Sequence, residues 1–385
     1  MRVWIENPFD NLPLEGFRPQ RYWLMAEAFA RAGHETVLWT SDFNHTTKAR
    51  RRLSRKPEAF ALRLLHAPAY SGNISLGRVF SHLAYARAWR RAAMAEADRS
   101  GAPDIIIAST PPLFACAAAR RLASRFGARF VVDVMDAWPE TFGRVAPAWA
   151  LAPLRLVAGA NYRAAAMVTA VASRYVDLVR RYGFGGPARL FYHGIALPSA
   201  APRRAAAPAT PLRLAYAGNL GVTYDLATVV RALTRLPGAT LDIAGAGSGE
   251  RDLAALASSL GLSARVHFRG YLGEEALADM LAGCDVGVVP MDESSCVGVP
   301  YKLCDYAKAS LAIASSLGGE SAELLAKYAA GAVYRTGDEA SLARALQSLD
   351  VRQAGDNARR MAEAEFDARK IYDSYVHFVT QGLCT

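Results

Sequence analysis

Short apolar runs alternate with longer segments of helical spacing along most of this chain. The runs are rich in Val, Ile, Leu and Ala and end in Gly, Pro, Ser or Asp, which is typical of buried strands. The predicted strands cover 2–5, 36–39, 104–108, 129–134, 167–172, 190–192, 212–216, 240–244, 266–268, 286–289 and 311–314, and helices are predicted between many of them. Strands joined by helices pair in parallel, so we predict an α/β protein that binds its ligands at the carboxyl ends of the strands.

The pattern breaks in a proline- and alanine-rich segment, residues 197–211, which has no apolar period. Such a composition is typical of a linker. The chain has 385 residues, the length of two α/β domains. We therefore predict a first domain at 1–196, a linker at 197–211, a second domain at 212–362 and a final helical segment at 363–385.

The stretch 284–316 combines several features of an anion site. The strand 286–289 leads into a polar loop at 291–300, and a helix begins at about Tyr301 and carries Lys302 and Asp305 in its first turns. A helix N-terminus offers free N–H groups and a positive dipole end. We interpret the stretch as a nucleotide-sugar site, with the diphosphate at the helix start and the ribose on Asp305. A plain strand–loop–helix with both side chains solvated remains the alternative.

Composition excludes several classes of protein. Hydrophobic residues make up 52% of the chain, yet the chain has no apolar run of about eighteen residues that would span a membrane. The N-terminus lacks an apolar signal core and resembles a first strand. The five cysteines show neither paired metal spacing nor a secreted framework. We therefore expect a cytoplasmic protein with reduced thiols and no metal site.

The charge lies almost entirely in the first half. Residues 1–200 hold 27 Lys and Arg against 14 Asp and Glu, whereas the remainder is slightly acidic. A basic half indicates an anionic partner, either the inner surface of a membrane or a phosphate-bearing acceptor. No DNA- or RNA-binding module is recognisable, so a nucleic acid is not the expected partner, although a nucleic-acid-binding first half remains a lesser hypothesis.

Several residues of the first half follow predicted strands. Gly16 allows close approach to a phosphate or sugar, or is a turn glycine. The loop that contains His45 and Lys48 and continues to Arg52 is either an acceptor or headgroup site or a solvated face. Asp136 either orients an acceptor hydroxyl or caps a neighbouring loop. The helix at 76–97 is either interfacial or core-facing.

Glycine turns follow two strands of the second half. The first contains Gly218 and Asn219, and the second runs from Gly245 through Gly247 to Gly249. The second turn matches a dinucleotide fingerprint only weakly, because its spacing is G-x-G-x-G and the strand about 20 residues further on ends in Arg269 rather than an acid. An NAD-dependent enzyme is therefore kept as a lesser alternative.

The segments LAYAGNLGVTYDL, LDIAGAGSGERDL, VHFRGYLGEEALADMLAGCDVGVVP and VGVPYKLCDYAKASLAIASS follow one another in the second half. In this order they resemble the donor domain of bacterial glycosyltransferases of family four. The segments RAGHETVLWTS and VVDVMDAWPE resemble the acceptor domain of the same family, in the branch that builds capsule, lipopolysaccharide and exopolysaccharide. The resemblance implies the GT-B fold, in which two Rossmann-like parallel-sheet domains face a cleft, and a C-terminal helix that returns to the N-terminal domain.

The resemblance also implies a function. The chain would be a retaining hexosyltransferase that moves a sugar from a nucleotide-sugar, UDP-linked rather than GDP-linked, to a glycan or polyprenyl-linked acceptor. It would work without a cofactor or bound metal, in the cytoplasm, with peripheral contact to the inner face of the membrane.

Carried over residue by residue, the resemblance assigns donor-side roles. Asp305 stands at the second of two family glutamates, while the first position is Val297, for which Glu293 or Ser294 would have to substitute. No cation follows the Gly218 turn, so Lys302 and the backbone N–H groups from Gly298 to Tyr301 would neutralise the phosphates. The donor-binding candidates are Gly16, Gly218, Asn219, Gly247, Tyr271, Leu272, Gly298, Val299, Tyr301, Lys302 and Asp305, with Tyr271 and Leu272 at the base.

Lys302, Asp136 and Glu293 are the catalytic candidates, and His45, Lys48 and Asp136 are the acceptor-binding candidates. Lys302 would stabilise the negative charge that grows on the leaving diphosphate. Because Val297 replaces a family glutamate, a sugar-nucleotide or polysaccharide-binding protein that has lost the chemistry is the alternative.

Overall fold

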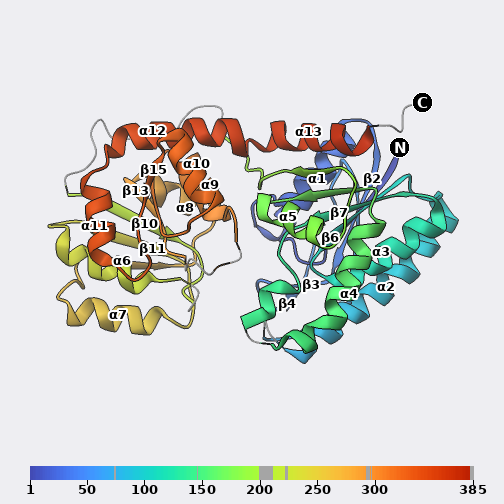
Figure 1. Cartoon of the computed structure of the whole chain (residues 1–385), viewed down its shortest axis with the longest axis horizontal. Helices are drawn as coiled ribbons and strands as arrows, with labels where there is room; N and C mark the ends of the chain where they lie inside the picture. The colour runs from blue at the N-terminus through green and yellow to red at the C-terminus, as the bar shows by residue number, and fades with distance from the viewer. Residues whose placement is uncertain are drawn as a thin grey trace. The chain divides into compact units, whose positions relative to one another are not determined.

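The computed structural model describes residues 1–72, 75–144, 146–198, 211–221, 224–291, 295 and 297–381. The chain forms two compact units (Figure 1). Unit 1 comprises Met1–Gly194 and Ala368–Thr385, and unit 2 comprises Ile195–Asp367. Most of the predicted linker, residues 199–210, lies outside the described residues.

Unit 1 is built on a seven-stranded parallel sheet of order β5-β2-β1-β6-β7-β8-β9. The sheet is covered by helices on both faces, which explains why its central strands are nearly continuous apolar runs. The strands are β1 (Arg2–Glu6), β2 (Glu35–Ser41), β5 (Ala61–Leu65), β6 (Ile105–Thr110), β7 (Arg129–Val134), β8 (Met167–Ala170) and β9 (Ala188–Leu190). A small antiparallel hairpin of β3 (Phe43–Asn44) and β4 (Ala49–Arg50) projects beyond the end of β2.

The helices of unit 1 divide between the two faces of the sheet (Figure 1). One face carries α1 (Arg21–Arg31) and α13 (Ala368–Thr380), whose aromatic and aliphatic side chains form a core with β1, β6 and β7. The other carries α2 (Leu76–Ser100), α3 (Leu113–Phe126) and α4 (Ala148–Ala164). Shorter helices are η1 (Pro13–Glu15), η2 (Glu140–Arg144) and α5 (Ser173–Arg181).

Unit 2 holds a six-stranded parallel sheet of order β12-β11-β10-β13-β14-β15. Its strands are β10 (Arg213–Ala217), β11 (Thr240–Ala244), β12 (Val266–Gly270), β13 (Val286–Val289), β14 (Ala312–Ser315) and β15 (Gly331–Val333). Numbered within the unit, the order is 3-2-1-4-5-6, the doubly wound arrangement. The strand order reverses between β10 and β13, and ligands of such sheets bind outside the carboxyl ends of strands at this switch point. The equivalent point in unit 1 lies between β1 and β6.

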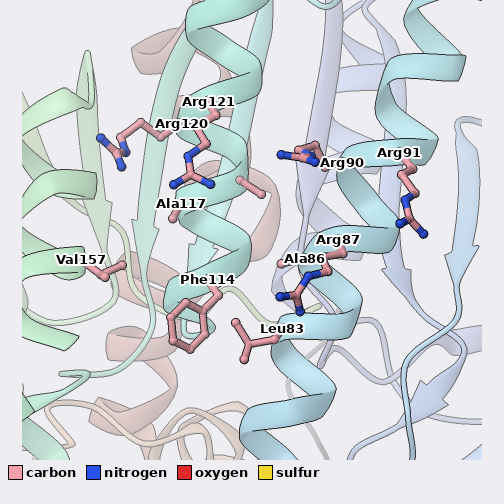
Figure 2. A pocket seen from close by; sticks show the side chains of 11 residues that line it. Leu83, Ala86, Arg87, Arg90, Arg91, Phe114, Ala117, Arg120, Arg121 and Val157 are labelled. Carbon is pink, nitrogen blue, oxygen red and sulfur yellow. The ribbon is translucent and has the colours of Figure 1, made fainter. Parts of the chain in front are cut away.

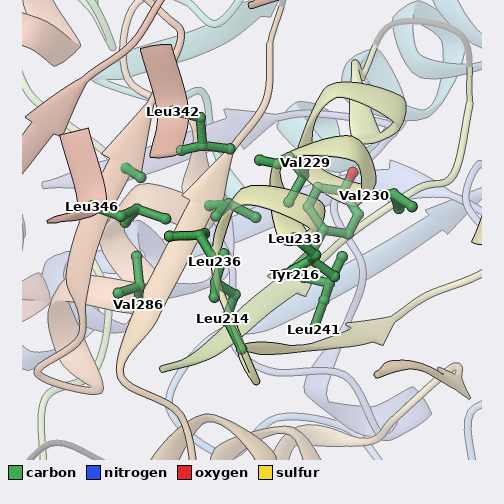
Figure 3. Packing of buried hydrophobic residues seen from close by; sticks show 14 of the residues in the cluster. Leu214, Tyr216, Val229, Val230, Leu233, Leu236, Leu241, Val286, Leu342 and Leu346 are labelled. Atoms are coloured by element: carbon green, nitrogen blue, oxygen red, sulfur yellow. The ribbon is translucent and has the colours of Figure 1, made fainter. Parts of the chain in front are cut away.

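The helices of unit 2 are α6 (Leu226–Ala232), η3 (Leu233–Arg235), α7 (Glu250–Ser259), α8 (Glu274–Ala282), α9 (Tyr301–Lys308), α10 (Glu320–Tyr328), α11 (Glu339–Gln347), α12 (Val351–Met361) and η4 (Ala362–Phe366). Figure 3 shows the core, in which Leu214 and Val286 from the sheet meet Leu233 of η3 and Leu342 of α11. Tyr216 belongs to this core but carries its hydroxyl at the strand's carboxyl end. The core thus fixes one side of the switch point.

The C-terminal segment differs from the single helical segment predicted for 363–385. The π-helical η4 ends at Phe366, Asp367 is extended, and α13 begins at Ala368. The backbone N–H of Ile195 donates to the Phe366 carbonyl, so the two passages of the chain between the units lie side by side. The β3–β4 hairpin and the edge strands β5 and β15 were not predicted.

Candidate functional site

The donor-side candidates gather at the switch point of unit 2. Gly218 directly follows β10, the loop after β13 reaches Pro300, and α9 begins at Tyr301. Because β10 and β13 are neighbours, these two loops meet at one edge of the sheet. The structure therefore brings together the Gly218 turn and Lys302, which lie far apart in the sequence.

Lys302 is the central charged group of this edge. Its side chain is only 8% exposed, and its ammonium group donates a hydrogen bond of 3.1 Å to the Tyr216 hydroxyl. The same nitrogen lies 4.4 Å from the ring centre of Tyr216 and 3.6 Å from that of Tyr224. Aromatic faces attract a cation, so the two rings hold the ammonium group in place at the carboxyl end of β10.

Burial lowers the pKa of Lys302 to about 7, although the nearby Asp305 carboxylate acts in the opposite direction. The ammonium group is therefore close to losing its proton at neutral pH. A diphosphate beside it would supply the negative charge that favours the protonated form. Without ligand, the positive charge of Lys302 is therefore only partly present at neutral pH.

Gly218 leaves room beside the ammonium group of Lys302. A Cβ atom at this position would lie 3.1 Å from the Lys302 nitrogen and 3.2 Å from the Tyr216 hydroxyl oxygen. The φ angle of Gly218 is +148°, which side-chain-bearing residues rarely adopt. The adjacent Asn219 is exposed, and its carbonyl accepts a 2.7 Å hydrogen bond from Tyr216. Thus Tyr216 connects the lysine with the glycine turn.

The Gly245–Gly249 run has a packing explanation. A Cβ atom at Gly245 would lie 1.8 Å from the Gly218 carbonyl oxygen, and Cβ atoms at Gly247 and Gly249 would each lie 2.7 Å from backbone atoms of Leu220. These glycines let the turn after β11 pack against the turn after β10. The dinucleotide interpretation therefore loses its main support, while donor binding by Gly247 remains a prediction.

The start of α9 has no side-chain cap. Its N-cap residue is Pro300, and Gly298 and Val299 before it are buried. The Ser321 hydroxyl donates a 2.5 Å hydrogen bond to the Gly298 carbonyl, which anchors this loop to α10. The first N–H groups of α9 have no intrahelical acceptor, as in any helix, which suits an anion.

The remaining donor-side candidates lie in α9, in the loop before it, or after β12. Tyr301 and Asp305 are half-buried in α9, and Asp305 acts electrostatically on Lys302. Val297 is half-buried, and its backbone N–H donates a hydrogen bond to the Ser295 hydroxyl. Glu293 and Ser294 lie outside the described residues. Tyr271 and Leu272 follow β12, an edge strand, and the Tyr271 ring is 70% exposed. A base-stacking role for that ring stays a prediction.

Tyr216 and Tyr224 were not predicted to be part of the site. Tyr216 lies in an apolar strand and reads as a core residue, and Tyr224 follows the Gly218 turn. Their pKa values are raised, mainly by burial. The sequence signal that could have identified Tyr216 as a site residue is its position two residues before Gly218, the glycine that follows β10.

In unit 1 the structure separates two aspartates that the sequence places together at the end of β7. Asp133 is fully buried and forms a two-bond ion pair with Arg21, at 2.8 and 2.7 Å. It also accepts hydrogen bonds from Tyr22 and Thr169. Burial alone would raise the pKa of Asp133, but the Arg21 charge and the hydrogen bonds donated to this carboxylate together outweigh burial and lower it. Asp133 therefore fastens α1 to the sheet.

Asp136 is half-buried beyond the end of β7. Its Oδ1 atom accepts hydrogen bonds from the Ala137 N–H at 2.7 Å and the Thr141 hydroxyl at 3.0 Å. Burial raises the pKa of Asp136, while Arg78 opposes this shift electrostatically. One carboxylate oxygen thus fixes the local loop, as the capping alternative expected, and the acceptor role remains a prediction.

A cluster of cations and aromatic rings surrounds the other acceptor candidates. We call it the cationic–aromatic cluster; it consists of Phe9, His45, Lys48, Tyr70, Arg78, His82 and Trp138. The Arg78 guanidinium lies 5.5 Å from the ring centre of Phe9 and 5.0 Å from that of Trp138. The Lys48 ammonium lies 4.9 Å from the Tyr70 ring centre and 3.3 Å from His45 Nδ1. These residues follow β1, β2, β5 and β7 or lie in α2.

Electrostatics in the cationic–aromatic cluster favour an anion. Burial and neighbouring cations lower the pKa of His45 to about 4 and that of His82 to about 3, so both imidazoles are neutral at pH 7. Burial and Arg78 also lower the pKa of Lys48. Lys48 has a φ angle of 56°, a strained conformation for a side-chain-bearing residue, and such strain is often found at functional sites. An anionic ligand would offset the repulsion between Lys48 and Arg78.

Two further arginines of the basic loop form ion pairs within unit 1. Arg50 forms an ion pair with Asp42, and Arg51 is buried and pairs with Glu15 while donating to backbone carbonyls of Asp10 and Ser41. The expectation of a solvated or ligand-binding run therefore fails for Arg51, whereas Arg50 is exposed. Gly16 ends η1 with φ 81°, and a Cβ atom there would meet nothing within 4 Å. Its conformation explains the glycine, while donor binding by Gly16 remains a prediction.

Among the described residues, Cys116, Cys284 and Cys304 are buried cysteines that form no disulfide. Burial raises the pKa of Cys284 to about 12, so it is no nucleophile. No group of three metal-ligating side chains occurs in the part of the chain that the structure describes. In the same residues, no helix has both the length and the apolarity needed to cross a bilayer.

Comparison with protein families decides the classification. Residues 20–196 match the model of the glycosyl transferase 4-like domain, and residues 211–350 match that of the glycosyl transferases group 1. The chain belongs to the family-four-like glycosyltransferases of the GT-B fold. Curated protein sequences give no match to this glycosyltransferase.

Solved structures share the fold of this glycosyltransferase at low sequence identity. Sucrose-phosphate synthase from Thermosynechococcus elongatus aligns with a TM-score of 0.75 at 18% identity, covering 99% of this chain and 98% of that one. HepE from Anabaena, in complex with UDP, aligns with a TM-score of 0.70 at 14% identity over 98% and 99% of the two chains. The lipopolysaccharide outer core galactosyltransferase WaaB aligns with a TM-score of 0.65 at 14% identity over 98% and 99%.

Proposed function

We propose that this glycosyltransferase moves a hexose, with retention of configuration, from a UDP-linked donor to a phosphate-bearing glycan or polyprenyl-linked acceptor in cell-surface polysaccharide synthesis. The observation that carries the donor part is the buried Lys302 ammonium group at the switch point of unit 2. A buried lysine whose pKa lies near 7 is a destabilising feature of the free protein. Such groups concentrate at functional sites, where the ligand supplies the missing charge.

The proposed reaction depends on electrostatic stabilisation of the leaving diphosphate. As the bond between sugar and phosphate breaks, negative charge grows on the phosphate oxygens. Lys302 donates hydrogen bonds to these oxygens, and the uncapped start of α9 presents its N–H groups to the same charge. Loss of one such contact costs on the order of 3 kcal/mol in the barrier.

The choice of a UDP-linked donor is supported by a structural relative. HepE has been solved in complex with UDP and with UDP-glucose. We propose that Asp305 accepts hydrogen bonds from the ribose and that Tyr271 and Leu272 contact the uracil. Asn219, Gly247 and Gly16 remain proposed donor contacts, and Glu293 a proposed catalytic group.

The cationic–aromatic cluster supports the acceptor part of the proposal. Lys48 and Arg78 would bind an acceptor phosphate, while the faces of Phe9, Tyr70 and Trp138 offer apolar surfaces for a sugar ring. Asp136 keeps one carboxylate oxygen in the local loop, and the other would accept a hydrogen bond from the acceptor hydroxyl. We further propose that transfer takes place at the inner face of a membrane, where a lipid-linked acceptor resides.

The experiment has two stages. Thermal shift with UDP-, GDP- and ADP-linked sugars should give the largest stabilisation with a UDP-sugar, because a bound ligand raises stability by mass action. Mass spectrometry of reactions with that donor and a polyprenyl-diphosphate-linked sugar should then show a product larger by one hexose, and NMR should show the donor's anomeric configuration. Binding without any product would contradict the proposal and favour a binding protein.

A further inference from the structure

An arginine-rich groove lies between α2 and α3 of unit 1, and it shares no lining residue with the candidate sites. Its volume is about 440 Å³, and five arginines line it: Arg87, Arg90, Arg91, Arg120 and Arg121. Figure 2 shows guanidinium groups from both helices at the space between them, with Leu83 and Phe114 at one end and Val157 of α4 nearby. No acidic residue lines the groove. It therefore combines several positive charges with an apolar floor.

These five arginines differ from others of the same unit. Arg21, Arg51 and Arg63 pair with Asp133, Glu15 and Glu96. None of the five groove arginines forms an ion pair or a side-chain hydrogen bond with the described residues, and the Nε atom of Arg120 is buried without a partner there. Like charges held together repel one another, so the groove is matched to an anion that the unit does not supply.

Exposed apolar side chains also occur on α2 and α4, two helices that contribute residues to this groove. Phe80 in α2 is 61% exposed, and Trp149 and Leu156 in α4 are 79% and 72% exposed. Among the large apolar side chains that are exposed in the described chain, five of nine belong to α2 and α4. Phe80 precedes the groove residue Leu83 by one helical turn, and Trp149 lies two turns before Leu156 on one side of α4. Exposed apolar side chains and the arginines thus occur on the same group of helices, with Leu83 and Val157 of the groove close in sequence to Phe80 and Leu156.

We propose that the surface of these helices binds a bilayer containing anionic phospholipid, with headgroup phosphates in the arginine groove and Phe80, Trp149 and Leu156 in the interfacial layer. Guanidinium groups match phosphate oxygens with paired hydrogen bonds. Tryptophan is favoured at the membrane–water interface, and each basic residue near an anionic surface contributes to binding. The proposal rests on the proposed membrane location of transfer and adds the surface responsible.

Charge complementarity together with the apolar side chains favours a membrane over a nucleic acid. A nucleic acid also offers phosphates, but it offers no apolar layer for Leu156 or Phe80. Proteins that bind single strands stack bases on aromatic rings, and such binding does not need an exposed leucine. The apolar component therefore distinguishes the two partners and enters the test.

The test is sedimentation of the full chain with phosphatidylcholine vesicles, with and without phosphatidylglycerol. The wild type should bind only the anionic vesicles. Because each basic residue contributes on the order of 1 kcal/mol, Arg90→Ser/Arg120→Ser should lower the partition coefficient roughly thirtyfold. Trp149→Ser/Leu156→Ser should lower it roughly tenfold at unchanged net charge. The control Arg231→Ser/Arg251→Ser removes two arginines from α6 and α7 of unit 2 and should bind like the wild type.

Three results would overturn the proposal: equal binding to neutral and anionic vesicles, groove variants that sediment like the wild type, or displacement by duplex DNA with no effect of the Trp149 and Leu156 changes. UDP affinity and transfer to a water-soluble acceptor, measured on the same variants, should stay within about twofold of the wild type. If the wild type transfers sugar but does not bind anionic vesicles, the proposed membrane-binding surface is refuted and the proposed function is not. If the wild type shows no sugar transfer at all, the proposed function itself is refuted.

Discussion

Replacing Lys302 with methionine should make the protein more stable although it removes the proposed catalytic cation. The pKa of Lys302 is lowered from 10.5 to about 7, chiefly by burial. At pH 7 the unfolded chain carries the proton almost fully and the folded protein only about half the time, which costs roughly 4 kcal/mol of stability. Methionine fills a similar volume, and the Tyr216 hydroxyl keeps its bond to the Asn219 carbonyl. We expect a net gain of roughly 2–4 kcal/mol.

The pH dependence follows from the sign of this shift. The folded pKa lies below the unfolded one, so the cost is fully present below pH 7 and disappears as the pH rises toward 10.5. Between pH 7 and pH 9 the wild type should therefore regain roughly 2 kcal/mol relative to Lys302→Met. The stability difference between the two proteins should narrow by that amount.

The chain provides a convenient assay for this effect. All six tryptophans lie in residues assigned to unit 1, so their fluorescence reports that unit alone, while far-UV circular dichroism reports both units. In urea titrations, Lys302→Met should shift the transition seen by circular dichroism and leave that of tryptophan fluorescence in place. The control Lys308→Met removes a charge from the last turn of the same helix, where a weak 3.7 Å pair with Glu274 should be worth under about 1 kcal/mol. Lower stability of Lys302→Met, or a difference that does not narrow at pH 9, would refute the reasoning.

The other predictions concern ligand binding and the buried pair. Gly218→Ala should weaken UDP binding at least about tenfold in calorimetry, because the new Cβ would lie 3.1 Å from the Lys302 nitrogen; Gly185→Ala, where a Cβ meets nothing within 4 Å, should bind UDP normally. Arg78→Ala should raise the acceptor KM roughly tenfold and leave the UDP Kd unchanged; a changed UDP Kd with an unchanged acceptor KM would place Arg78 on the donor side. Asp133→Asn leaves the Arg21 charge buried without its partner and should cost about 3–5 kcal/mol, read from tryptophan fluorescence in urea; a loss below 1 kcal/mol would contradict the fixing role of the pair. Because His45 and His82 stay neutral with pKa values of about 4 and 3, the acceptor KM should be flat between about pH 6 and 8, and a step near pH 6.5 would contradict these shifts.

Much of the fold could be predicted because both sheets are parallel and buried. Strands such as β6 and β13 are continuous apolar runs bounded by turn residues, and the pattern identifies them directly. The strand β5 was missed because it is a partly exposed edge strand with Arg63 in its centre. The β3–β4 hairpin was missed because two-residue strands leave no period to detect.

The site could be predicted only in part, since sequence spacing shows which residues follow strands but not what they contact. Lys302 and Gly218 were identified from their places after β13 and β10. Their juxtaposition depends on the pairing of those two strands, which no local pattern specifies. Arg51 is an error of another kind: it was expected to be solvated or to bind a ligand, but it is buried and pairs with Glu15. The sequence of a basic run does not show which of its residues is buried against an acidic partner.

The most direct test of the central claim, that a diphosphate binds at Lys302, is the number of protons taken up when UDP binds at pH 8. Calorimetry in two buffers of different ionisation enthalpy gives this number. Since Lys302 is mostly neutral at pH 8 and a diphosphate would restore its charge, the wild type should take up close to one proton per UDP, and Lys302→Met none. UDP binding to the wild type without proton uptake, or equal uptake by Lys302→Met, would contradict the account.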